Sequence, residues 1–153
     1  MADDQPSPPP APAPGAEAPL ATSDDVRAIL ETTTTWAVVG CSDDPSRDSH
    51  RVAAQLQRWG YRVLPVNPAL EEVLGERCWP GLAAIPAEEG VEVVDVFRRS
   101  SQAGVHVDEA VAIGAAAVWL QLGVVDRAAA ARARAAGLRV VMDRCPLIER
   151  PRL

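Results

Sequence analysis

The residues best suited to chemistry in this sequence lie in one polar segment, residues 40–50, which reads GCSDDPSRDSH. The segment starts with Gly40 after an apolar run, carries Arg47, and brings Ser49 to the start of a helical pattern. Amide groups at the start of a helix attract anions, and a nearby guanidinium adds to that attraction. We therefore predict that the segment binds a phosphate or pyrophosphate group. The alternative is that Ser49 only caps the helix while Arg47 is solvated.

The apolar pattern places this segment between a strand and a helix. Residues 36–40 are a short, continuous apolar run that ends at glycine, which is typical of a strand covered on both faces of a parallel sheet. Residues 50–59 carry apolar side chains at helical spacing and are followed by Gly60. The same reasoning predicts strands at residues 61–66, 91–97, 115–122 and 138–142, and helices at residues 23–31, 107–113 and 126–136. Residues 71–86 are less regular, and only a short helix or turn is expected there.

The alternation of strands and helices predicts the fold class. Five strands separated by helices indicate an α/β fold, namely a doubly wound, mostly parallel five-stranded Rossmann-like sheet with helices on both faces. A chain of 153 residues has room for one such domain. Alternating alanine and proline leave nothing to pack near the start, so we expect residues 1–22 to be a disordered tail and residues 23–153 to be the folded domain.

Composition narrows the classes of partner and compartment. The net charge is −6 and every basic residue is an arginine, which argues against a broad basic face for nucleic acid. The sequence shows no signal peptide and no apolar stretch long enough to span a bilayer, so we expect a cytoplasmic protein without a membrane partner. Cys41, Cys78 and Cys145 lack the paired spacing of a zinc site, which predicts reduced thiols and no bound metal.

Ligands of doubly wound sheets bind beyond the carboxyl ends of the strands. Besides the segment 40–50, this rule selects three positions, which are Asn67 with Pro68, Phe97 with Arg98, and Gln121 with Leu122 and Gly123. The dinucleotide fingerprint G-x-G-x-x-G is reduced here to its first glycine, and the second strand ends at Asn67 rather than at an acid. An NAD site is therefore disfavoured.

Several motifs, in order along the chain, resemble those of the small stand-alone CoA-binding proteins. The chain from about residue 36 to its end is similar to that family, whose Rossmann-like domain is itself similar to the CoA-binding domain of the succinyl-CoA synthetase alpha subunit. The matching segments are AVVG at residues 37–40 with Ser42, Pro45 and Arg47, GYRV and PVNP within residues 60–68, DVFR at residues 95–98, VWLQLG at residues 118–123 and VMDRC at residues 141–145.

The resemblance implies that coenzyme A lies over the carboxyl edge of the sheet. Its pyrophosphate is then expected on residues 41–49, and its adenosine end near Asn67 and Pro68 and near Phe97 and Arg98. The full set of candidate binding residues is Gly40, Cys41, Ser42, Pro45, Arg47, Ser49, His50, Val66, Asn67, Pro68, Phe97, Arg98 and Gln121. Family members often carry lysine where this chain has Ala69. An arginine, Arg47, Arg51 or Arg98, would therefore have to hold the 3′-phosphate.

Cys41 and Gln121 allow two interpretations each, whereas one role is expected for each of Asp143, Arg144 and Trp119. Amides at a helix start lower the pKa of a thiol, so Cys41 could form a mixed disulfide with the CoA thiol, or it could be a small buried residue below the loop. Gln121 either contacts the ligand or is a satisfied polar residue at a strand end. Asp143 and Arg144 are expected to form an internal pair that braces the C-terminal segment. Trp119, inside an apolar strand, is predicted to belong to the core.

We therefore expect a protein that binds coenzyme A or an acyl-CoA as a non-catalytic carrier, sensor or regulatory module. No histidine lies beside a nucleophile motif, and no catalytic residue is assigned. Two alternatives stay open, which are the CoA-binding part of an ADP-forming acyl-CoA synthetase assembly and an NAD(P)-binding oxidoreductase-type domain. The sequence also leaves open a protein partner or a homodimer.

Overall fold

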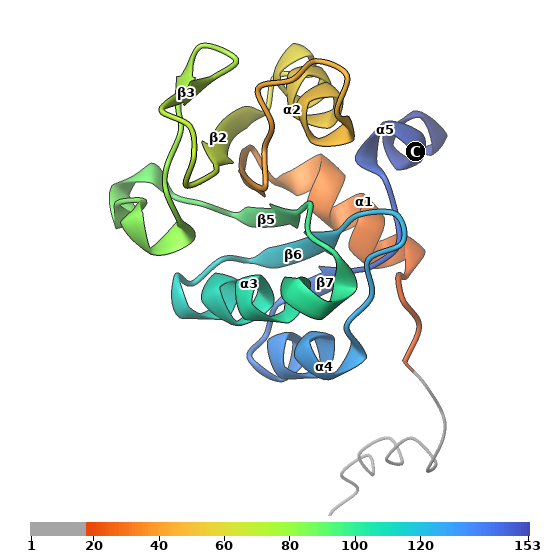
Figure 1. The fold of residues 1–153 in the computed structure, drawn as a ribbon. Helices are drawn as coiled ribbons and strands as arrows, with labels where there is room; N and C mark the ends of the chain where they lie inside the picture. Colours follow the sequence, from red (N-terminus) through yellow and green to blue (C-terminus); the bar gives the residue numbers. More distant parts are fainter. Residues whose placement is uncertain (1–17) are drawn as a thin grey trace, which may run out of the picture.

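The computed structural model describes residues 18–153, and its centre is a five-stranded parallel sheet (Figure 1). The strands are β1 (Thr35–Val39), β2 (Arg62–Val66), β5 (Val93–Val96), β6 (Ala117–Leu120) and β7 (Arg139–Val141). Their order across the sheet is β2-β1-β5-β6-β7, and all four pairings are parallel. The predicted α/β class and the five predicted strands are confirmed. Strand β1 begins and ends one residue earlier than predicted, and the other four strands are one to four residues shorter than predicted.

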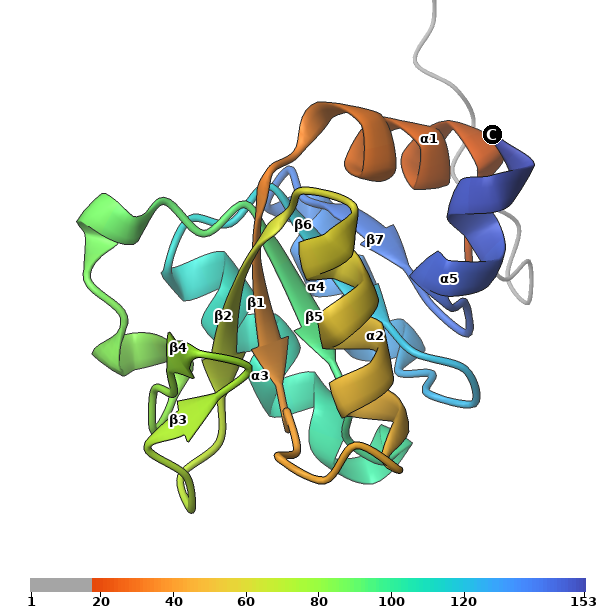
Figure 2. The same ribbon diagram turned by 90° about the horizontal axis from the view of Figure 1, so that it is seen from above.

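Helices cover both faces of the sheet, as expected for a doubly wound fold (Figures 1 and 2). One face packs against α3 (Ser100–Ala112) and α4 (Arg127–Ala135). The other packs against α1 (Ser23–Thr32), α2 (Asp48–Arg58) and the C-terminal α5 (Pro146–Glu149), which a short turn η3 (Arg150–Arg152) follows. Trp36 and Trp119 lie fully buried on this second face, which confirms the core role predicted for Trp119.

Helix α3 begins seven residues before the start predicted from the apolar pattern, at Ser100 instead of residue 107. Its first turns carry small residues, of which only Ala103 is buried, so they give little periodic signal. Gly104 brings α3 close to the start of α4, because a Cβ there would lie 2.5 Å from the carboxylate of Asp126. The packing of α3 on α4, rather than local apolar spacing, therefore places these first turns in the helix.

The segment between β2 and β5 contains a hairpin that the sequence pattern did not predict. Strands β3 (Glu72–Val73) and β4 (Glu76–Arg77) pair antiparallel, and short turns η1 (Leu82–Ala84) and η2 (Ala87–Glu89) follow. Trp79 then forms an isolated parallel bridge with Val66, outside the edge of β2. With that bridge counted as the remnant of a strand, the sheet has the strand order of a Rossmann fold.

The packed part of the chain begins before the expected boundary at residue 23. The carbonyl oxygen of Leu20 accepts a hydrogen bond of 2.8 Å from the amide of Met142. Leu20 also packs against the core beside α3 and α4, and Arg134 donates to the carbonyl oxygen of Pro19. A disordered tail was predicted for residues 1–22. Residues 1–17 of that tail lie outside the described residues. None of the helices in residues 18–153 has the length and apolar character that crossing a bilayer requires.

Candidate functional site

The strand order changes direction between β1 and β5, so their carboxyl ends form the switch point where this fold binds ligands. Gly40 follows β1 there with φ of +80°. A Cβ at this position would lie only 2.6 Å from the carbonyl oxygen of Phe97, and the amide of Phe97 donates to Val39. The close approach that requires glycine at residue 40 is thus to the backbone at the end of β5.

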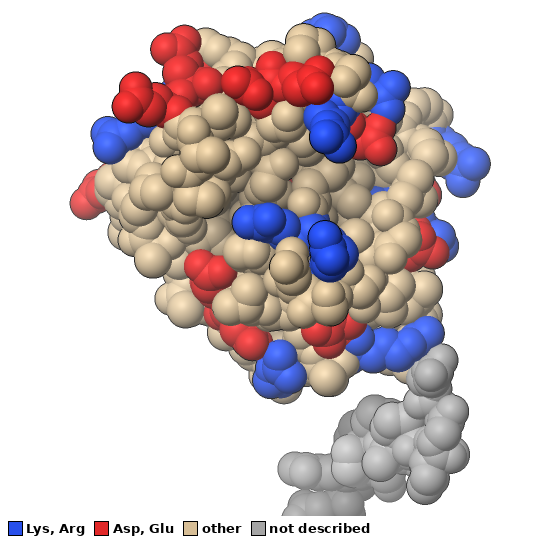
Figure 3. Space-filling view, in the orientation of Figure 1, with Lys and Arg blue, Asp and Glu red and all other residues tan. Residues whose placement is uncertain are grey.

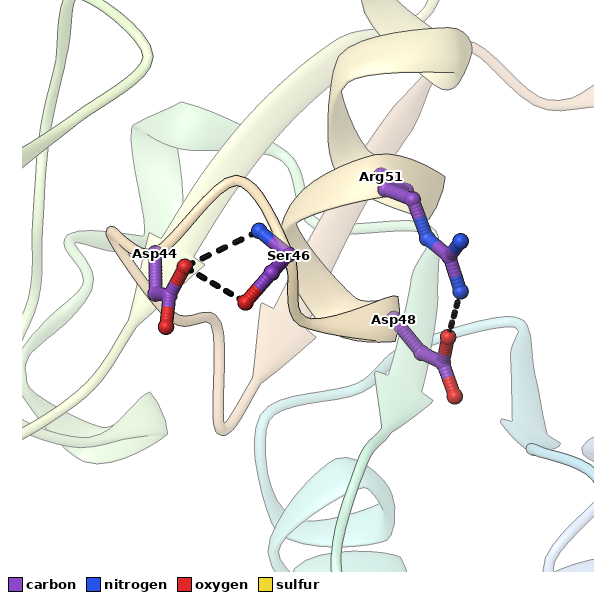
Figure 4. Close-up of polar contacts among 4 residues, drawn as sticks. All are labelled: Asp44, Ser46, Asp48 and Arg51. Carbon is purple, nitrogen blue, oxygen red and sulfur yellow. Dashed lines mark hydrogen bonds and ion pairs between the residues drawn. The ribbon is translucent and has the colours of Figure 1, made fainter.

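The loop after Gly40 is held in shape by its own serine and aspartate side chains. The amide of Ser42 donates to the hydroxyl of Ser49 at 3.0 Å, and the hydroxyl of Ser42 accepts from the amide of Asp44. Asp44 in turn accepts from the amide and hydroxyl of Ser46 (Figure 4), and these hydrogen bonds lower the pKa of its carboxyl. Ser49 is buried inside the first turn of α2, so the expectation that it caps the helix is wrong.

The start of α2 offers unpaired donors next to this loop. The amides of Asp48, Ser49 and His50 have no acceptor among the described residues, and no side chain caps the helix. The guanidinium of Arg47 is exposed and makes no ion pair or hydrogen bond with any described residue. One feature opposes an anion here, because the carboxylate of Asp48 lies in the same turn. Arg51 pairs with that carboxylate and offsets its charge (Figure 4).

Asn67 fastens this loop to the end of β2. Its Nδ2 donates to the carbonyl oxygen of Cys41 at 3.0 Å, and its Oδ1 accepts from the amide of Ala69 at 2.9 Å. The carbonyl oxygen of Val66 accepts from the amides of both Gly40 and Cys41. A ligand contact by Asn67 stays a prediction, and it would use the second N–H of Nδ2 or the second lone pair of Oδ1. Pro68 is exposed beside it.

A cavity of about 660 Å³ opens on the other side of the switch point, between α2, the ends of β5 and β6, and α5. Figure 3 shows basic side chains around a hollow on this face, between α2 and the start of α3. The lining contains charged residues in the first turn of α2 and just before α3, one polar residue, and apolar residues from α2, the end of β5, the loop after β6, and α5 with the residue before it. These are Asp48, Arg51, Arg98 and Arg99; Gln121; and Val52, Phe97, Leu122, Gly123, Val124, Cys145, Leu147 and Ile148.

The cavity brings together some of the predicted residues and leaves out others. Phe97, Arg98 and Gln121 line it, as the rule for strand ends predicted. Pro45 and His50 line a separate pocket on the outer side of α2. Leu122 and Gly123, which the same rule selected, also line the cavity. The apolar residues of α5 were missed, because the C-terminal segment gave only a structural signal.

Beneath the cavity lies a buried pair, Asp95 and Gln121. Gln121 is 6% exposed and its Nε2 donates to Oδ1 of Asp95. Asp95 is fully buried, and its Oδ2 has no hydrogen-bond partner among the described residues. Burial raises the pKa of Asp95 to about 8, although the hydrogen bond from Gln121 lowers it. Gln121 therefore has a hydrogen-bond partner for its Nε2 in the core, and it also forms part of the cavity wall.

Asp143 and Arg144 position the loop and helix that complete the cavity, but they do not pair through their side chains as expected. The carboxylate of Asp143 accepts from the amide of Gly123 at 2.7 Å and thereby holds the loop after β6. Arg144 pairs with Glu149 of α5 at 3.5 Å. The expected brace of the C-terminal segment is thus made by Arg144 alone.

Cys41 is a buried residue below the loop rather than an activated thiol. It is fully buried, and desolvation, with smaller contributions from Cys78 and Asp95, raises its pKa to about 12. The interpretation with a lowered pKa is wrong because desolvation by burial dominates. Burial also raises the pKa values of Cys78 and Cys145. A mixed disulfide at Cys41 has no support from this environment.

We predict that Cys41 does not react with iodoacetamide in the native protein at pH 8. A thiol of such high pKa holds almost no thiolate, and the surrounding side chains block access. Brief labelling followed by peptide mass spectrometry should find Cys41 unmodified, whereas labelling in urea should modify all three cysteines. Native labelling of Cys41 at the rate seen in urea would contradict this burial.

Comparisons with known proteins agree with this geometry. Residues 34–151 match the family described as the CoA binding domain. The chain is 36% identical over 121 residues to protein YneT of Bacillus subtilis (strain 168), which covers 79% of this chain and 88% of that relative. It is 41% identical to a hypothetical protein from Pyrococcus horikoshii OT3, with a TM-score of 0.81 over 86% of this chain and 92% of that one.

A more distant structure shares the fold. Acetyl-coenzyme A synthetase 1 of Ca. Korarchaeum cryptofilum, described as dinucleotide forming, superimposes with a TM-score of 0.65 and is 24% identical, covering 76% of this chain but 27% of the synthetase. The family match extends over most of the chain and includes both the loop after β1 and the strand ends that line the cavity. This chain therefore belongs to the CoA binding domain family.

Proposed function

We propose that this protein binds coenzyme A or an acyl-CoA along the carboxyl edge of its sheet, as a non-catalytic carrier, sensor or regulatory module. The observation that carries the proposal is the start of α2, where three free amides and the unpaired Arg47 adjoin a cavity bordered by Arg98 and Arg99. Such a site suits a pyrophosphate. Membership of the CoA binding domain family supports coenzyme A as its source.

At the switch point, the two parts of a ligand on either side of its pyrophosphate would extend in opposite directions along the edge of the sheet. From a pyrophosphate on α2, one arm extends toward β2 and Asn67, and the other extends into the cavity toward β6 and Gln121. The adenosine arm carries a charged 3′-phosphate, whereas the pantetheine arm is neutral. We assign adenosine to the β2 side, where the chain is exposed at Pro68 and Ala69, and pantetheine to the cavity.

The residue that holds the 3′-phosphate follows from this assignment. Arg51 and Arg98 line the cavity on the β5 side, which places them away from the adenosine. Of the three arginines named from the sequence, Arg47 on the loop therefore remains as the candidate that binds the 3′-phosphate. The structure adds Arg77, whose guanidinium lies 4.1 Å from the ring centre of Trp79, the residue bridged to the end of β2.

The non-catalytic role is supported by the state of the side chains that could act as nucleophiles or bases. Burial raises the pKa values of all three thiols, and His106 is engaged with Glu109 of its own helix. A role as one part of a larger synthetase is the main alternative, since the chain corresponds to about a quarter of the synthetase that shares its fold. An assay for ATP-dependent thioester formation by the purified protein separates the two roles, because turnover would exclude a pure binding module.

Calorimetric titration with CoA, acetyl-CoA, NAD and NADP tests the ligand. All four contain a pyrophosphate, so a preference depends on the remaining groups. We expect CoA and acetyl-CoA to bind and both nicotinamide dinucleotides to bind much more weakly, because no acid follows β2 to bind the ribose hydroxyls of NAD. Binding of NAD more tightly than CoA would overturn the proposal.

Arg47→Ala is expected to weaken CoA binding about tenfold to a hundredfold, because a charge-assisted hydrogen bond to phosphate is worth about 1.5–3 kcal/mol. Arg132→Ala is the matched control, since Arg132 pairs with Asp108 on helices away from this edge and its loss should leave the affinity unchanged. Titrations of both variants with CoA measure the difference. Equal affinities for the two variants would remove Arg47 from the site.

A further inference from the structure

The cavity has an apolar end that a phosphate site does not require. Leu122, in the loop after β6, is 57% exposed, and Ile148, in α5, is 42% exposed. Both line the cavity, together with Leu147 and Val124. Large apolar side chains that are exposed on separate elements and directed to one cavity indicate a site for an apolar group.

This apolar end is continuous with the proposed phosphate site. The cavity starts at the first turn of α2, where Asp48 and Arg51 line it, and Arg98 and Arg99 border it at the start of α3. Charged side chains at the starts of α2 and α3 and apolar side chains of the β6 loop and of α5 therefore line one continuous cavity. A ligand anchored by its phosphates on α2 has these apolar side chains within the same cavity.

The wall of the cavity also holds an oriented amide. Nε2 of Gln121 donates to the buried Asp95, which fixes the plane of the side chain. Oε1 of Gln121 has no hydrogen-bond partner among the described residues, and it is not among their fully buried unpaired atoms. A polar group in an otherwise apolar wall suits a chain that carries amide or thioester groups before an apolar terminus.

We infer that the apolar end of the cavity binds the acyl group of an acyl-CoA, so that the ligand class is a thioester with an apolar acyl chain rather than free coenzyme A. This inference rests on the proposed function and extends it. A free thiol would leave Leu122 and Ile148 uncovered at the mouth of the cavity, whereas an acyl chain covers both.

The test is a calorimetric series of CoA, acetyl-CoA, butyryl-CoA, hexanoyl-CoA and octanoyl-CoA on the full chain. Each methylene group that becomes buried should tighten binding about threefold, until the chain fills the apolar end. If CoA binds but affinity is flat along the series, the acyl inference is overturned and the proposed function stands. If CoA does not bind, the proposed function fails and the inference fails with it.

Two exposed substitutions and a control locate the effect. Leu122→Ser and Ile148→Ser should each reduce the dependence on chain length, measured as the ratio of the octanoyl-CoA affinity to the CoA affinity of the same variant. Val105→Ser is the matched control, because Val105 is 60% exposed on α3 and does not line the cavity. A chain-length dependence that survives both cavity variants overturns the assignment. Light scattering provides a second check. If the protein is a dimer and either variant dissociates it, the assignment is also overturned, because a second copy of the chain would then cover these side chains.

Discussion

Gly40→Ala is expected to destabilise the protein by about 3 kcal/mol and to abolish CoA binding. The residue has φ of +80°, which costs an L side chain about 1–2 kcal/mol. The added Cβ would also lie 2.6 Å from the carbonyl oxygen of Phe97, so the ends of β1 and β5 must separate. Because the switch point lies between those ends, the phosphate loop and the cavity move apart. Urea unfolding measures the stability loss, and titration with CoA measures the binding loss.

Gly60→Ala is the control that separates strain from close approach. Gly60 also has a positive φ, +96°, but a Cβ there would meet nothing within 4 Å. Its substitution should therefore cost only the strain of the backbone conformation, about 1–2 kcal/mol, and leave CoA affinity unchanged. If both variants lose the same stability and both still bind CoA, the contact between Gly40 and Phe97 does not organise the site.

Asp95→Asn is expected to remove a steep pH dependence of stability. Burial raises the pKa of Asp95 from its ordinary value of 3.8 to about 8. Between those values the folded protein keeps the proton that the unfolded chain releases. The contribution of Asp95 to stability is thus fully present below about pH 4 and is lost as the pH rises to about 8. The slope is about 1.4 kcal/mol per pH unit, so the total reaches several kcal/mol.

The asparagine variant isolates this effect because its amide stays neutral and can still accept the hydrogen bond from Gln121. Urea unfolding of both proteins at pH 5, 6, 7 and 8 should show the unmodified protein losing stability relative to the variant as the pH rises. The nearby thiols of Cys41 and Cys145 have raised pKa values and stay protonated over this range. Parallel curves for the two proteins would show that Asp95 ionises as an ordinary carboxyl.

The outline of the site could be predicted because its signals are local. The apolar run ending at Gly40, the absence of an acid after β2 and the position of Arg98 and Gln121 at strand ends all depend on neighbours along the chain. The rule for strand ends then selects one edge without any knowledge of packing. Similar reasoning found α2 and α4, whose apolar spacing is clear, but not the first turns of α3, where Ala103 is the buried residue.

Residue types and their spacing by themselves determined the layered α/β fold, and they predict the edge that binds and the anionic character of the ligand. Only the tertiary structure decided that Cys41 is buried, that Asn67 fastens a loop, and that Asp95 lies under Gln121. Each of these depends on which distant segments enclose a side chain, and desolvation and hydrogen bonding across the sheet then set its chemistry. The apolar end of the cavity is the clearest case, since Leu122 and Ile148 meet there only because β7 and Asp143 return the chain to the same edge.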